Sequence, residues 1–324
     1  MNRRRAVLSA LAGVALGSAL PARAQAKPLR VGAVFGSSTA GDVFYESLRQ
    51  GFRDAGYVEG SNLTLVPYWG EESPDRLKQV VAEMLKTDPQ VIVTQGTAAF
   101  AVHATQTTIP VAFGFSGDPV EAGFVQSLSR PGGNMTGISF LALELVGKRM
   151  EMLREVIRGV KRVAVVAAPQ HPGDKAERRA SEQAAAALGL TIVYFEARNA
   201  PELAAAMATI EKSGCDATMF FPVQTVISER ERIAAWSART RMPTVSGWST
   251  FTDGGNLMSY GPNLRDSMAR LAFFVDRIAK GTKPAVIPVE LPTRVEFVIN
   301  QKAAKALGIT IPRAVELRAD RVIA

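Results

Sequence analysis

A two-lobed α/β protein, with a doubly wound parallel sheet in each lobe, is the fold class that this sequence predicts. Short apolar runs rich in β-branched residues alternate with longer segments of helical periodicity, which is the pattern of parallel βαβ units. About 300 residues follow the N-terminal segment, more than one compact core usually holds. A turn-rich stretch, residues 129–137, separates two similar halves of the pattern.

The first 26 residues have the features of an export signal. Arg3, Arg4 and Arg5 form a basic head, an apolar stretch covers residues 6–20, and small residues then stand at the spacing that signal peptidase reads. Cleavage after Ala24 and after Ala26 fit equally well, and both the Sec and the twin-arginine route stay open. We expect a periplasmic protein without a lipid anchor, because no cysteine stands at the cleavage site.

Charge and cysteine content exclude several classes of protein. Removal of the export segment, with its four arginines, lowers the net charge from +8 to +4, and the remaining basic residues stand among acids on helix faces. We therefore expect no nucleic-acid partner. Cys215 is the single cysteine, which rules out an internal disulfide, and charges interrupt every apolar stretch after residue 26, so no membrane-spanning helix is expected.

The first half is predicted to contain four strands and three helices. Phe44, Leu48 and Phe52 recur at four-residue spacing on the first helix, which ends at Gly56. The strands are expected at 29–35, 63–69, 90–94 and 110–115, and the other two helices at 74–86 and 97–106.

The second half repeats this alternation after the turn-rich stretch, whose continuation 138–141 we expect to cross between the lobes. Beyond the repeat, Met268, Leu271 and Val275 mark one face of a long helix over 264–280. Helices are expected at 143–157, 174–188, 201–212, 227–240 and 301–307, strands at 162–167, 191–195, 217–221, 243–245 and 256–260, and an extended segment at 286–291.

Five short motifs, taken in their order along the chain, form a specific combination. They are GDPV at 117–120, SLSRPGGNMTG at 127–137, LMSYGPN at 257–263, IPVELPT at 287–293 and AAKALGITIP at 303–312. Together they resemble the ABC transporter substrate-binding proteins of the tryptophan/tyrosine-binding type, which have the type I periplasmic binding protein fold. The resemblance implies a three-crossing hinge, with residues 27–139 and 256–285 in the first lobe and residues 140–255 and 286–324 in the second.

The same resemblance implies a function. The lobes would close over a small organic solute, an amino acid or another aromatic or carboxylate compound, and an ABC permease would then receive it. No catalytic residue, metal or cofactor is implied, and we expect a monomer. Relatives often carry Asn and Asp at the positions of Ala168 and Val223, and this difference puts amino-acid specificity in question.

Candidate ligand contacts of the first lobe follow from the rule that open parallel sheets bind ligands beyond the carboxyl ends of their strands. These positions are Ser37 and Ser38 after the first strand, and Gly96, Thr97 and Ala98 after the third. Backbone N–H groups and the Thr97 hydroxyl can hold a carboxylate there, although Thr97 can equally cap its helix.

Asp118 follows the fourth strand and has two alternative roles. Its carboxylate can pair with a ligand ammonium group, but Asp118-Pro-Val-Glu121 is also a favourable helix start, and the sequence favours this capping role.

The second lobe contributes polar and aromatic candidates. Gln170, Gln224 and Ser246 follow its strands, and Trp248 and Tyr260 can stack on a planar ligand. We prefer these two aromatic residues over Trp69 and Phe140 for that role.

Alternative functions have less support in the sequence. A periplasmic α/β hydrolase would need a nucleophile motif, but Gly114-Phe-Ser-Gly117 has the wrong spacing, and His103 and His171 stand in different lobes without metal-site spacing. A DNA-binding regulator would carry a helix-turn-helix where the export signal stands. A module that senses a ligand for a membrane receptor has the same sequence features and stays open.

Overall fold

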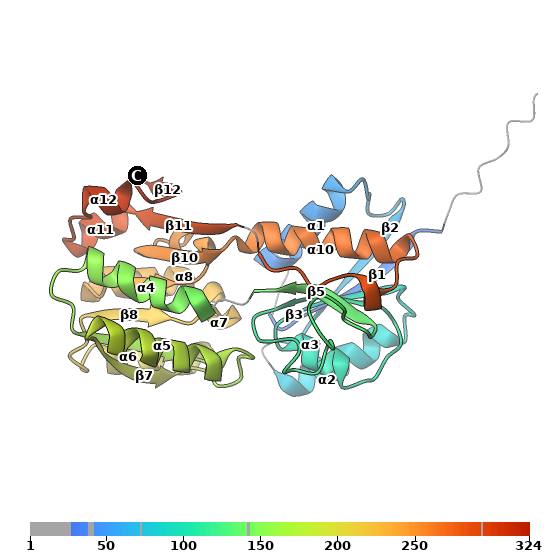
Figure 1. The fold of residues 1–324 in the computed structure, drawn as a ribbon, viewed down its shortest axis with the longest axis horizontal. Coiled ribbons are helices and arrows are strands. Elements are labelled where there is room, and N and C mark those ends of the chain that lie inside the picture. Colours follow the sequence, from blue (N-terminus) through green and yellow to red (C-terminus); the bar gives the residue numbers. More distant parts are fainter. Residues whose placement is uncertain (1–26, 38–41, 72, 141–142, 293) are drawn as a thin grey trace, which may run out of the picture.

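The computed structural model describes residues 27–37, 42–71, 73–140, 143–292 and 294–324, so the predicted export signal and Ser38 lie outside the described residues. Two α/β lobes stand side by side (Figure 1). Of the described helices, none is long and apolar enough to cross a membrane.

The first lobe is built on a five-stranded sheet of order β2-β1-β3-β4-β5, in which every pairing is parallel. The helices α2 and α3 cover one face of this sheet, and α1 and α10 cover the other (Figure 1). The elements are β1 (Leu29–Phe35), α1 (Val43–Asp54), β2 (Leu63–Trp69), α2 (Pro74–Leu85), β3 (Val91–Gln95), α3 (Ala98–His103), β4 (Val111–Phe115), β5 (Met135–Ser139) and α10 (Leu264–Ala279).

The second lobe is built on a seven-stranded sheet of order β12-β11-β10-β9-β8-β6-β7, in which only the β10–β11 pairing is antiparallel. Its strands are β6 (Arg162–Ala167), β7 (Thr191–Glu196), β8 (Ala217–Phe220), β9 (Thr244–Ser246), β10 (Met258–Pro262), β11 (Val295–Asn300) and β12 (Arg321–Ile323). Its helices are α4 (Leu143–Val156), α5 (Asp174–Leu188), α6 (Ala200–Ile210), α7 (Gln224–Ser228), α8 (Arg230–Thr240), α9 (Ser249–Asp253), α11 (Gln301–Leu307) and α12 (Arg313–Glu316).

Side-chain caps explain where several helices begin. Ser73 accepts a hydrogen bond from the Arg76 N–H (3.3 Å) ahead of α2, with Pro74 at the first helical position. Asp42 caps α1 through the N–H groups of Phe44 and Tyr45 (2.7 and 3.2 Å). These caps hold the first turns of α1 and α2 close to the carboxyl ends of the strands.

The chain passes between the lobes three times, as expected, but two predicted boundaries are wrong. β10 pairs with β9 and β11 of the second lobe, so residues 256–262 do not belong to the first lobe. Residues 286–290, which we expected in the second lobe, remain on the first, where Val289 N donates to Leu128 O (2.7 Å) and Glu290 N to Gly137 O (2.9 Å). The crossings therefore lie after β5, after β10 and just before β11.

Candidate functional site

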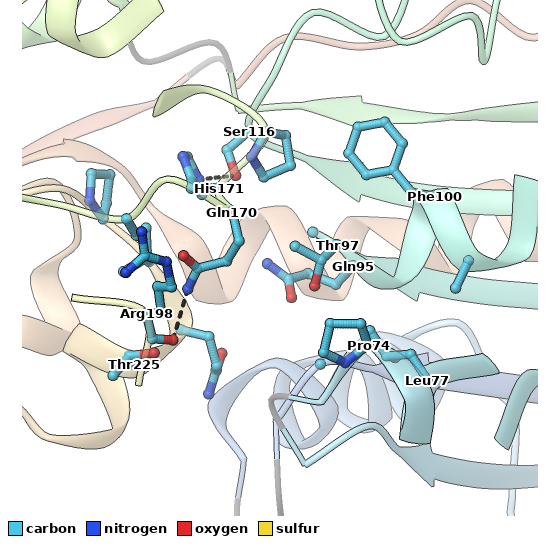
Figure 2. Close-up of a pocket in the computed structure, with 18 of the residues that line it drawn as sticks. Pro74, Leu77, Gln95, Thr97, Phe100, Ser116, Gln170, His171, Arg198 and Thr225 are labelled. Carbon is cyan, nitrogen blue, oxygen red and sulfur yellow. Dashed lines mark hydrogen bonds between the residues drawn. The ribbon is translucent and has the colours of Figure 1, made fainter. Parts of the chain in front are cut away.

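A cavity of about 440 Å³ lies between the lobes. Both lobes contribute to its wall, and most of the side chains that line it are apolar or uncharged (Figure 2). The lining residues are Gly36, Pro74, Leu77, Lys78, Gln95, Gly96, Thr97, Phe100, Ala101, Ala104 and Ser116 from the first lobe, and Ala168, Gln170, His171, Pro172, Arg198, Pro222, Val223, Gln224, Thr225 and Trp248 from the second.

Two polar side chains of the first lobe are directed into this cavity (Figure 2). Gln95, at the end of β3, is only 6% exposed, and its amide forms no hydrogen bond within the described part of the chain. The Thr97 side chain, just before α3, makes no capping hydrogen bond. The capping role considered for Thr97 is therefore wrong, and both side chains keep their hydrogen-bonding capacity for a ligand.

Half of the residues that the second lobe contributes to the wall are apolar. Ala168, Pro222 and Val223 present no polar side-chain atom, and Trp248 adds one edge of a ring that packs edge-on against Phe44 of the first lobe (5.8 Å between centroids). A planar or aliphatic group can therefore pack against this wall with little desolvation cost.

Gln170 lies among these apolar residues and is held in place. Its Nε2 donates to the backbone oxygen of Arg198 (2.7 Å), as Figure 2 shows, which leaves the Oε1 atom as an acceptor for a ligand.

Two hydrogen bonds join the lobes beside the cavity. Gln224 Nε2 donates to Asp42 Oδ2 (3.1 Å), and His171 Nε2 lies 3.0 Å from Ser116 Oγ. Burial raises the pKa of Asp42, while the Ser37 hydroxyl and the backbone N–H groups of α1 oppose that rise. Each hydrogen bond requires that the lobes lie close together.

The imidazole of His171 is linked to a buried cluster in the second lobe. Its Nδ1 lies 3.7 Å from Glu177 Oε2, and the fully buried Arg149 lies behind it on α4. Desolvation lowers the pKa of His171 to about 4 and that of Arg149 to about 10, and it raises the pKa of Glu177 to about 8. At neutral pH His171 is therefore an uncharged imidazole.

The guanidinium of Arg149 is held by the backbone of β10. Its Nε donates to the Tyr260 oxygen (2.9 Å), and a Cβ atom at Gly247 would approach Nη2 to 2.7 Å. Arg149 is not among the residues that line the cavity, so it supports the wall from behind.

The structure brings five of the predicted ligand contacts to the cavity: Gly96, Thr97, Gln170, Gln224 and Trp248. Their ligand role stays a prediction.

Five other predicted contacts lie elsewhere, and for each there is a physical reason. Ala98 is buried inside α3, Ser246 donates to Phe220 O (3.0 Å) in the second-lobe core, and the Tyr260 ring packs on Phe297 (6.1 Å). Ser37 is buried beside Asp42. Asp118 accepts from the N–H groups of Val120 and Glu121 (2.8 and 3.4 Å), but residues 119–123 form a turn and not a helix, so the expected helix start is wrong and the side chain stabilises this turn instead.

The aromatic residues that we ranked lower are core residues. Trp69 stacks on Phe35 (5.3 Å), and Phe140 is buried against Trp248 (6.4 Å).

The contribution of helix faces to the site was not predicted from the sequence. Leu77 and Lys78 on α2, and Phe100, Ala101 and Ala104 on α3, line the cavity although they do not follow a strand. The signal was their spacing, because residues three and four apart share one side of a helix. Once α2 and α3 are placed beside the strand ends, this side faces the second lobe.

Comparisons with known proteins agree on one family. A family model described as ABC transporter substrate binding protein matches residues 33–323. A tyrosine-binding protein of Clostridioides difficile is 22% identical over 261 residues, which are 79% of this chain and 74% of that protein.

Two solved structures are similar over most of their length. One, a conserved domain protein of Vibrio cholerae, is 27% identical with a TM-score of 0.83, and the match covers 91% of this chain and 99% of the other. The other, an ABC domain from Streptococcus pneumonia in complex with L-Trp, is 23% identical with a TM-score of 0.82, and the match covers 92% and 100%.

Proposed function

Because this chain belongs to the family of ABC transporter substrate-binding proteins, we propose that it is the periplasmic capture component of an ABC-type importer, which closes its lobes over a small organic solute. Members of this family bind solutes outside the cytoplasm and are not enzymes. The predicted export signal in residues 1–26 supports a periplasmic location.

The observation that carries the proposal is the cavity between the lobes. Its wall comes from both sheets, so a ligand inside it touches both lobes only when they are close together. A ligand with this differential affinity shifts the equilibrium toward the closed form. The free polar groups of Gln95 and Thr97 on one side, and the apolar wall around Val223 on the other, suit a solute with one polar end.

The relatives support a ligand of one or two rings. One of them is a tyrosine-binding protein, and a similar structure holds L-Trp. A cavity of about 440 Å³ has the volume of an ordinary small-molecule site. The closed form would then be the shape that the permease recognises.

A thermal-shift screen tests this function. The purified chain without residues 1–26 is heated with members of a library of amino acids, aromatic acids and other small organic acids. A ligand at about 100 times its Kd stabilises the folded form by roughly 2.7 kcal/mol, so one chemical class should raise the Tm clearly. A flat response across the whole library would contradict the proposal.

A further inference from the structure

The charges around the cavity limit which solute can enter. Lys78 and Arg198 are the only formally charged side chains among the described lining residues, and neither an Asp nor a Glu is found there. His171 also lines the cavity, but it is uncharged at neutral pH. Among the residues that the structure describes, the wall therefore holds no negative charge that could compensate a cationic group of a ligand.

Several acidic side chains close to the lining residues are already engaged, and Glu177, 3.7 Å from His171, has its pKa raised to about 8 by burial. Both oxygens of Asp42 accept hydrogen bonds, from the first turn of α1 and from Gln224 Nε2 (3.1 Å). Glu196 and Glu202 pair with the Arg198 guanidinium at 3.2 Å each, and Asp75 pairs with Lys78 at 3.4 Å. These acids neutralise the two cations from outside the cavity and do not face its interior.

An α-amino acid would bring an ammonium group into this space. Transfer of an ammonium group from water to an apolar site without a paired carboxylate costs several kcal/mol. The second-lobe positions Ala168, Pro222 and Val223 can neither accept a hydrogen bond through their side chains nor supply charge, and the Oε1 atoms of Gln170 and Gln224 can accept a hydrogen bond but carry no charge. A zwitterion therefore gains its carboxylate contacts only at the cost of a cation that has neutral acceptors and no counter-charge in the described lining.

A carboxylate, in contrast, meets suitable donors. The Gln95 amide is nine-tenths buried, is directed into the cavity and has no described partner, and the Thr97 hydroxyl beside it is free of the cap (Figure 2). An amide N–H and a hydroxyl both donate to carboxylate oxygens.

We therefore propose, on the basis of the proposed function, that this cavity takes a planar or apolar carboxylic acid that lacks an amino group and discriminates against α-amino acids. The carboxylate accepts hydrogen bonds from Gln95 and Thr97, and the ring or chain packs against Ala168, Pro222 and Val223.

Isothermal titration calorimetry with matched compounds tests the ligand class. The pairs 3-phenylpropanoate and L-phenylalanine, and indole-3-propanoate and L-tryptophan, differ only in the ammonium group. Phenethylamine and tryptamine keep the amine and lack the acid. We expect at least one acid to bind about tenfold or more tightly than its amino-acid partner, with no binding of the amines.

The outcomes separate this inference from the proposed function. Tighter or equal binding of an amino acid would overturn the inference and leave the function intact. The absence of binding by every compound here and in the wider library would overturn both.

A substitution at Val223 gives an independent test. Val223 occupies the position before the first residue of α7, without a capping hydrogen bond, so Asp and Asn are both favourable there. Val223→Asp adds a carboxylate to the wall, and Val223→Asn is the uncharged control of nearly equal size. We expect Val223→Asp to weaken binding of the acid tenfold or more and to favour the amino acid, whereas Val223→Asn keeps the preference for the acid. An unchanged preference in Val223→Asp would contradict the inference.

Discussion

Acidification from pH 7 to pH 5 is expected to weaken ligand binding, because a protonated His171 does not fit between closed lobes. The Gly173 N–H donates to Nδ1 (3.2 Å), so Nδ1 is the acceptor, and Nε2–H donates to Ser116 Oγ across the cleft. Protonation places a hydrogen on Nδ1, which can then no longer accept the hydrogen bond from Gly173. The His171 side chain is only 8% exposed, so its charge would be poorly solvated.

The groups that face His171 do not rescue the charged form. Glu177 approaches Nδ1 to 3.7 Å, but burial raises the pKa of Glu177 to about 8, so the carboxyl is protonated throughout this pH range. The nearby Arg149 guanidinium is cationic and favours the Glu177 carboxylate, although less than burial disfavours it. Asp174, on the same helix, opposes ionisation of Glu177.

The magnitude follows from linkage. Burial lowers the pKa of His171 from 6.5 to about 4 in the closed form. When the lobes separate, the ring loses Ser116 and meets water, so its pKa returns toward the ordinary value. Closure then costs about 2 kcal/mol more at pH 5 than at pH 7, roughly a 20-fold rise in Kd. Because the pKa of His171 is lower in the closed form than in the open form, the contribution of the neutral ring to closure is complete above pH 6.5 and is lost as the pH falls toward 4.

The assay is calorimetric titration of one ligand from pH 7.5 to pH 4.5, with His171→Gln as the control. The Gln amide can still donate to Ser116 but does not titrate, so its Kd should change little beyond the ligand's own titration, which both proteins share. Parallel pH profiles for the two proteins, or tighter binding by the wild type in acid, would refute this reasoning.

Three further substitutions distinguish effects on ligand binding from effects on the stability of the fold. Gln224→Glu places a carboxylate against Asp42 and should raise Kd about tenfold at pH 7 with an unchanged Tm, measured by calorimetry and thermal melting. Asp118→Ala removes the side-chain hydrogen bonds of the turn over residues 119–123 and should lower the free energy of unfolding by about 1 kcal/mol while Kd stays the same, and an altered Kd would argue against this purely structural role. Gly117→Ala brings a Cβ to 3.0 Å from Pro172 Cβ and should weaken binding without loss of secondary structure by circular dichroism, so unchanged affinity would place the interlobe contact elsewhere.

Strand positions were predictable because buried parallel strands are continuous apolar runs. β1 and β2 have the predicted bounds, and β6 does as well. The sheet to which a strand belongs was not predictable in the same way. The sequence of residues 258–262 would suit a buried strand in either sheet. Only the pairing with β9 and β11 places this strand in the second lobe.

Helices over polar, charged segments were predicted with less detail. The expected helix over 227–240 is two helices, α7 and α8, which meet at Glu229. β5, β11, β12, α9 and α12 were not predicted, because each is short and takes its stability from neighbours instead of its own periodicity, and β5 begins inside the turn-rich stretch.

The site residues that lie beyond strand ends were predictable from the sequence. The direction in which each side chain points was not. Gln170 and Gln224 were found because they lie in the segments that follow β6 and β8. Gln95 is the last residue of β3, and its role required knowing that its buried amide has no described partner. Ser246 also follows this rule, but its hydroxyl turns to Phe220 O in the core.

The distance between the lobes is the measurement that tests lobe closure most directly. Spin labels at Ala82→Cys on α2 and Gln183→Cys on α5, both exposed positions, report it in a Cys215→Ser background. We expect the free protein to sample a broad range of longer distances and the saturated protein a single shorter one. An identical distance distribution with and without a bound ligand would contradict the account.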